Sequence, residues 1–312
     1  MIRNQEQNLD NYDKENIKVE IARAKAEKES RLKSEFEEIK NIVNEDLRRS
    51  LDLATEKGSG SWLTALPIQT LGFSLNKREF RDGISLRYSW KIPETPFHCC
   101  CGEKNDVDHT LICKLGGYVT MRHNAIRDLE AELLREVCKD VKTEPELLPL
   151  GNLELHGNSA EKARLDVSAV GIWSPMERTF LDVRITHPNS PSYRDKTPEQ
   201  LYRQHEQEKK RDYNNRVLQV EKGSFTPLVF STSGGMGPEC TKYHKRIAEL
   251  VSIKRKEEYS HVMSYIRTKI RFCLLRSTLV AVRGERGRRR RQGHLSEVAY
   301  NLIPELRSYE SA

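Results

Sequence analysis

The stretch ARLDVSAVGIWSPMERTFLDVRIT, residues 163–186, predicts two adjacent β-strands joined by a turn. Apolar and polar side chains alternate along residues 163–170 and again along residues 179–186, which is the period of a strand with two different faces. The linker GIWSP carries Gly171 and Pro175, and both residue types are common in turns between strands. We therefore expect a β-hairpin over this stretch.

Helical and strand-like patterns flank the hairpin on both sides. Apolar residues at steps of four predict an amphipathic helix over residues 125–137. Three further helices are expected over residues 198–213, 239–256 and 257–282, and two further strands over residues 216–220 and 226–230. Helices that alternate with strands predict an α/β domain, in which a mixed sheet is flanked by helices.

The first hundred residues carry a different pattern. Residues 15–57 are rich in Lys, Glu, Arg and Ala, and apolar residues at steps of three and four predict one long helix that ends at Gly58. We expect this helix to pack on its own domain, with partner binding or a coiled coil as the alternative. Residues 61–98 are irregular, and they predict a strand or two and a short helix.

Composition and charge narrow the class of protein. The 312 residues are 37% apolar and 32% charged, with a net charge of +7. No stretch reaches the about 18 apolar residues of a membrane span, and the first residues lack the apolar core of a signal peptide. We therefore expect an intracellular protein without membrane contact. Clustered cysteines inside cells indicate a metal site rather than disulfides.

A basic run lies near the C-terminus, at Arg283, Arg286 and residues 288–291. Such a run favours contact with nucleic acid or import into the nucleus. A solvated tail without a partner is the alternative reading. The sequence predicts no oligomeric state.

The segment CCCGEKNDVDHTLIC, residues 99–113, has the composition of a zinc site. Zinc takes four nitrogen or sulfur ligands in a tetrahedron, and the best set is Cys99, Cys101, His109 and Cys113. With four protein ligands no coordination position stays open, so the metal is expected to be structural. Reserve ligands are Cys100, His98 and His123. Free thiols near a surface turn are the alternative.

The carboxylates of the predicted hairpin indicate a second kind of metal site. Asp166 and Asp182 each lie on the face opposite the apolar residues of their strands. Two carboxylates that approach one point repel unless a cation holds them, and hard oxygen ligands suit Mg²⁺ or Mn²⁺. Arg184 projects on the same side as Asp182, where a cation can meet a phosphate. The alternative is a solvent-facing set of charges on an antiparallel sheet.

The order of these motifs resembles a known family. After the cysteine cluster come Arg122-His123-Asn124, Glu144-Pro145, Arg164-Leu165-Asp166 and Leu181-Asp182-Val183. This order is similar to the C-terminal region of non-LTR retrotransposon proteins that carry a restriction-like endonuclease, over about residues 60–250. In that family a zinc knuckle precedes a nuclease domain of the PD-(D/E)XK type. The chain has no reverse transcriptase motif.

The resemblance implies Mg²⁺- or Mn²⁺-dependent cleavage of DNA in the nucleus, with RNA as a second candidate partner. Asp166 and Asp182 take the places of the metal-binding aspartates, and Glu144 is an additional acidic candidate. The proline before the first aspartate is Leu165 here, and the motif lysine is Arg184. A guanidinium cannot act as a base, so Lys209 or Lys210 is expected to supply the missing amine.

Together, these patterns and the resemblance predict a division of the chain. It consists of a charged N-terminal helix (1–57), a linker and zinc knuckle (58–124), a restriction-endonuclease-like domain (125–282) and a basic tail (283–312). The departures from the family pattern keep a second function open, in which a catalytically inactive nucleic-acid-binding module retains the fold. An interaction protein built around the N-terminal helix is a third.

Overall fold

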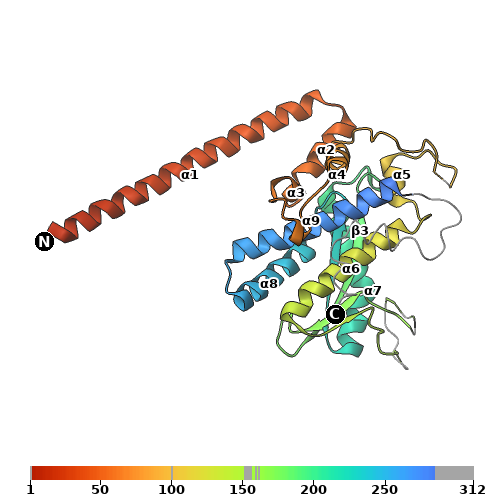
Figure 1. Cartoon of the computed structure of the whole chain (residues 1–312). Coiled ribbons are helices and arrows are strands. Elements are labelled where there is room, and N and C mark those ends of the chain that lie inside the picture. The colour runs from red at the N-terminus through yellow and green to blue at the C-terminus, as the bar shows by residue number, and fades with distance from the viewer. Residues whose placement is uncertain (1, 100, 151–156, 159, 161, 285–312) are drawn as a thin grey trace. The chain divides into compact units, whose positions relative to one another are not determined.

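The computed structural model describes residues 2–99, 101–150, 157–158, 160 and 162–284 (Figure 1). The chain divides into two compact units, one that ends at Leu51 and one that begins at Asp52, and each is described by itself. The reserve ligand Cys100 and the basic residues beyond residue 284 lie outside the described residues. The expected domain limits stay predictions.

The predicted single N-terminal helix is two helices. Helix α1 spans Ile2–Ile42, and α2 spans Glu45–Thr55. The side chain of Asn44 accepts a hydrogen bond from the backbone nitrogen of Leu47 at 2.9 Å, so Asn44 is the N-cap that starts the second helix. Within α1, pairs such as Arg23–Glu27 link successive turns of the helix.

A four-stranded mixed sheet forms the centre of the second unit. The strands are β1 (Lys139–Thr143), β2 (Val167–Val170), β3 (Arg178–Thr186) and β4 (Ser224–Ser231), in the spatial order β1-β2-β3-β4. Strand β2 pairs antiparallel with both β1 and β3, and β4 pairs parallel with β3. The expected β-hairpin and the α/β class with a mixed sheet are thus confirmed. The restriction-endonuclease-like identity of the fold stays a prediction.

Helices cover both faces of this sheet. Helices α6 (Tyr118–Val137) and α8 (Pro238–Arg255) pack on the face that holds Leu181 and Val183. Helix α7 (Pro198–Arg216) provides the crossover between the parallel strands β3 and β4, and the cluster on its face includes Phe180. Alternate residues of β3 point to opposite faces, so Asp182 and Arg184 point toward α7.

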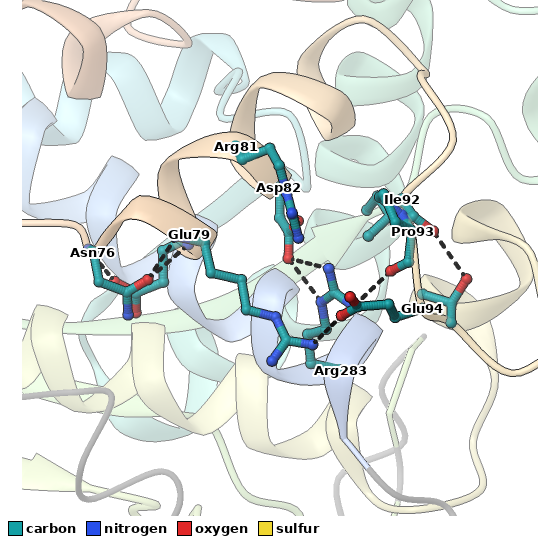
Figure 2. A network of polar contacts seen from close by, with 10 residues as sticks. Asn76, Glu79, Arg81, Asp82, Ile92, Pro93, Glu94 and Arg283 are labelled. Atoms are coloured by element: carbon teal, nitrogen blue, oxygen red, sulfur yellow. Dashed lines mark hydrogen bonds and ion pairs between the residues drawn. The ribbon is translucent and has the colours of Figure 1, made fainter.

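Helix α9 (Tyr259–Arg283) is buried along most of its length and packs against α6 and α8 (Figure 1). It also carries buried charges that bind the preceding part of the unit. Figure 2 shows Arg283 donating to the carboxylate of Asp82 at 2.7 Å and to the carbonyl oxygen of Pro93 at 2.7 Å. Because Asp82 is buried, this ion pair fixes the end of α9 against helix α4 (Lys77–Arg87).

Two of the expected strand regions are helical. Residues 61–98 form α3 (Ser61–Thr64), a 3-10 turn (Gln69–Leu71) and α4, because their aromatic residues pack on α9 rather than in a sheet. Residues Val217–Glu221 form a π-helical turn after α7. There Val217 is buried while Leu218 is 55% exposed, so this apolar run fills no strand position.

The remaining predicted helices are present, with bounds that differ by a few residues; the helix expected over residues 125–137 begins earlier, at Tyr118. A short helix, α5 (Val107–Ile112), lies in the cysteine-rich segment. Among the described helices, none is both long enough and apolar enough to span a membrane.

Candidate metal and carboxylate sites

Three cysteines and one histidine meet at one point. The ligand atoms of Cys99, Cys101, His109 and Cys113 all lie within 4.8 Å of one another, and we call these four residues the Cys3His cluster. The Sγ atoms of Cys99 and Cys113 are 3.9 Å apart, and Cys101 Sγ is 3.2 Å from His109 Nε2. A tetrahedron with metal–ligand distances of about 2.0–2.3 Å needs separations of about 3.3–3.8 Å. This donor set can therefore hold a metal ion such as zinc.

Local backbone structure brings the four ligands together. Gly102 adopts a positive φ of 97°, and its backbone nitrogen donates to the carbonyl oxygen of Cys99 at 2.9 Å, which turns the chain between the first two ligands. Asp106 caps α5 by accepting from the backbone nitrogen of His109 at 2.8 Å. Cys113 then follows the last residue of α5 and closes the cluster.

The cluster also favours a thiolate. Burial raises the pKa of the Cys99 thiol, but hydrogen bonds from the Cys101 backbone and the His109 side chain outweigh burial and lower the pKa to about 6. The thiolate is the form that binds a metal. Among the reserve ligands, His98 and His123 are not members of this cluster.

The two predicted aspartates lie at the same end of β2 and β3. Asp166 immediately precedes β2, and its Oδ2 accepts a hydrogen bond from the backbone nitrogen of Val183 at 2.6 Å. Asp182 lies within β3, and its Oδ2 is 2.5 Å from Lys209 Nζ of α7. Among the described residues, Asp182 Oδ2 is buried and accepts no hydrogen bond of regular geometry, although the Lys209 ammonium lies beside it. We call Asp166, Asp182 and Lys209, together with His123, the carboxylate site.

His123 is the member of this site whose place was not expected. Its Nε2 lies 3.2 Å from Asp166 Oδ2 and 3.1 Å from the carbonyl oxygen of Val183. Both neighbours are acceptors, so Nε2 carries the hydrogen. The assignment of His123 as a reserve zinc ligand is wrong, because α6 directs its ring to Asp166. The only sequence signal was its position in the Arg-His-Asn motif.

Charges at the carboxylate site interact. Burial raises the pKa of the Asp182 carboxyl; the Lys209 ammonium acts in the opposite direction, and the charge of Asp166 raises this pKa again. The hydrogen bond to Asp166 raises the pKa of His123. Because the charge of Asp166 acts on the pKa of Asp182, the two carboxylates are close enough to share one cation. The opposing Lys209 charge shows that positive charge is favourable at this position.

The other predicted residues lie at or beyond the edge of this site. Arg184 is bound by Glu208 of α7, at 2.9 Å. The backbone nitrogen of Glu144 donates to the carbonyl oxygen of Asp166 at 2.8 Å, while its carboxylate pairs with Arg127 of α6. Glu144 is thus beside the site, and its catalytic role stays a prediction.

The structure separates the two candidate lysines. Lys209 contacts Asp182, and its Nζ lies 5.7 Å from the centre of the Tyr213 ring. Lys210 instead pairs with Glu239 of α8 at 2.7 Å. The alternative that placed the amine on Lys210 is therefore wrong as a description of this geometry, and Lys209 takes the position.

The chain matches no protein-family model, and no curated protein matches it significantly. Its function is therefore argued from the Cys3His cluster and the carboxylate site.

Proposed function

We propose that the chain is a metal-dependent DNA endonuclease of the restriction-like class, related to the C-terminal region of non-LTR retrotransposon proteins. One observation carries the proposal. The fold brings Asp166, Asp182 and Lys209 from β2, β3 and α7 to one point, although the intervening sequence contains many other charged residues. Two acidic groups and one amine are the set that the resemblance implies for cleavage of a phosphodiester.

The residues of the carboxylate site have separate tasks in this proposal. Asp166 and Asp182 would hold Mg²⁺ or Mn²⁺ through their carboxylate oxygens. When bound, the cation supplies charge neutralisation and lowers the pKa of water. Lys209 donates to the phosphate or to the attacking water, and His123 keeps the Asp166 carboxylate in one orientation.

The Cys3His cluster has a different task. We propose that it binds zinc with all four ligands, which leaves no position for a reacting water. Zinc at this cluster therefore stabilises the fold of residues 99–113 and takes no part in the reaction. The net charge of +7 and the resemblance support DNA as the partner, with RNA second, and action in the nucleus.

A nicking assay tests the proposal. Supercoiled plasmid is incubated with the full chain and Mg²⁺ or Mn²⁺, and the relaxed form is measured on a gel. We expect relaxation that EDTA abolishes and that Asp182→Ala lacks. A wild-type chain that binds plasmid but never relaxes it under any of these conditions contradicts the endonuclease.

One observation favours a second function, a nucleic-acid-binding module without catalysis. The position of the motif lysine holds Arg184, and Glu208 occupies its guanidinium. In this case the chain retards DNA in a gel, and the affinity falls steeply with salt because phosphate contacts release counterions. Binding of equal strength by wild type and Asp182→Ala, with no cleavage by either, supports this function.

A further inference from the structure

One side chain beside the Cys3His cluster, that of Asp108, contacts the segment that links β3 to α7. Asp108 of α5 immediately precedes the cluster ligand His109. Its Oδ1 lies 2.9 Å from Nε2 of His187, the residue that follows β3, and its Oδ2 lies 3.4 Å from an Nη2 atom of Arg194. One carboxylate of the cysteine-rich segment thus binds two points of the segment that links β3 to α7.

His187 also contacts the end of the sheet. The residue is buried, and its Nδ1 lies 2.8 Å from the hydroxyl oxygen of Thr232. Thr232, directly after β4, donates its backbone nitrogen to the carbonyl oxygen of Thr186 at 2.9 Å. The His187 ring therefore connects the ends of β3 and β4 to Asp108 of α5.

Residues 187–197 connect two elements that carry residues of the carboxylate site, β3 with Asp182 and α7 with Lys209. Asp182 lies five residues before His187 on the same chain, and α7, which carries Lys209, begins at Pro198. A six-residue helix such as α5 is not stable by itself in water, because helix nucleation costs more than a few hydrogen bonds return. Two features hold α5, and hence Asp108. Leu111 packs with Tyr118 of α6 and with Val280 and Ala281 of α9, and the Cys3His cluster closes around the helix.

We propose that Asp108 is a positioning residue that couples metal binding at the Cys3His cluster to the order of residues 187–197. Zinc binding fixes α5, α5 places Asp108, and Asp108 holds His187 and Arg194. The inference rests on zinc binding, which is part of the proposed function, and it is independent of cleavage. It assigns to the metal an effect on a segment that contains none of its ligands.

Hydrogen–deuterium exchange of backbone amides tests the coupling. The amides of Ser190, Tyr193 and Lys196 are hydrogen-bonded within the segment and serve as reporters, and those of β3 and β4 serve as the internal reference. We expect chelation of zinc to speed exchange of the reporters about tenfold, as the loss of one charge-assisted hydrogen bond allows. In Asp108→Asn we expect fast exchange with zinc bound and little further change on chelation.

Matched controls separate the coupling from a merely structural role. Asp195→Asn changes an exposed carboxylate in the same segment and should behave as wild type. Wild-type exchange in zinc-loaded Asp108→Asn, or a further large acceleration of its reporters on chelation, overturns the proposal. If chelation also speeds exchange in β3 and β4, the internal reference is lost. The comparison of zinc-loaded Asp108→Asn with zinc-loaded wild type then decides whether Asp108 orders the segment.

The outcome for zinc and the outcome for cleavage are read separately. A chain that binds no zinc overturns the coupling and the zinc site together, whatever the nicking assay gives. A chain that binds zinc and shows unchanged reporters on chelation overturns the coupling alone. Absence of nicking with intact coupling contradicts only the endonuclease.

Discussion

The Cys3His cluster and the carboxylate site are built in opposite ways. The four cluster ligands lie between Cys99 and Cys113, on a turn and a helix of six residues. The carboxylate site takes its residues from α6, the β2–β3 hairpin and α7, each of which is held by the core of the second unit. The first arrangement comes from one short stretch of sequence, whereas the second is dispersed along the chain and supported by the sheet.

This difference determines what a cation contributes at each place. At the cluster, four donors lie within 4.8 Å of one another on a turn and a short helix, with a small apolar cluster around Leu111, so a bound metal would add stability to this segment. At the carboxylate site, the sheet and Lys209 hold the aspartates in place without a metal, so the cation proposed there would supply chemistry. Removal of a metal from the Cys3His cluster should destabilise the local fold. Removal of the cation from the carboxylate site should lower activity and leave the fold unchanged.

The largest effect is expected from breaking the cluster. Cys113→Ser removes a buried ligand, and we expect zinc affinity to fall by more than about 100-fold, since even indirect partners of a metal are worth about 10–100-fold. Zinc content by mass spectrometry and competition with a coloured chelator measure this. Cys138→Ser, outside the cluster, is the control and should bind zinc as wild type does. Equal affinity in both variants contradicts the cluster.

The next effect concerns activity. Asp182→Ala removes one of two cation-holding groups, and we expect the nicking rate to fall by about 100-fold or more, the scale of losing one electrostatic contact in a reaction. Zinc content and the far-ultraviolet circular dichroism spectrum should stay those of wild type, because the site is supported by the sheet. Loss of zinc in this variant would show that the two regions are not separately held.

Lys209 and Lys210 provide a matched pair of variants, for which we expect a smaller effect on the nicking rate than for Asp182→Ala. Lys209→Met removes the amine beside Asp182, and we expect a fall in nicking rate of about 10- to 100-fold, because one charged donor is lost. Lys210→Met breaks a pair with Glu239 away from the site and should leave the rate unchanged. Rates that fall equally in the two variants would mean that α7 contributes general positive charge and no specific group.

The smallest effect is on stability at Asp166. Asp166→Asn retains an acceptor for the backbone nitrogen of Val183, so the unfolding midpoint should hardly change. Asp166→Ala leaves that nitrogen without its acceptor, which costs about 1–3 kcal/mol of unfolding free energy. Urea denaturation compares the two. Nicking should be lost in both, and a stable Ala variant would contradict the structural part of the assignment.

Local features were predictable from the sequence, and features set by distant contacts were not. The Cys3His ligands follow from spacing, because a turn and a single helical turn bring them together wherever the segment lies. The hairpin follows from alternation of residue types. Strand β1 was missed because it is largely exposed and has one apolar residue among five, so no alternation marks it.

The misread regions depend on partners far along the chain. Residues 61–98 form helices because Trp62 and Phe73 pack against Phe272 and Leu275 of α9. The choice between Lys209 and Lys210 depends on the rotation of α7 about its axis, since neighbouring helical residues point about 100° apart. The role of His123 depends on how α6 lies over the sheet. None of these quantities is a property of a short stretch of sequence.

The contact between Asp166 and Val183 has a consequence for descendants of this gene. The backbone nitrogen of Asp166 donates to Leu181 at 3.1 Å, and the next rung of the β2–β3 ladder is formed by the Asp166 side chain, which accepts from Val183. The Asp166 carboxylate thus accepts the hydrogen bond that a backbone carbonyl oxygen of β2 would otherwise accept from Val183. A copy that had lost cleavage would still be selected for an acceptor at position 166. At position 182 burial of the charge is costly, so a copy without the proposed cleavage would have no reason to keep the carboxylate there.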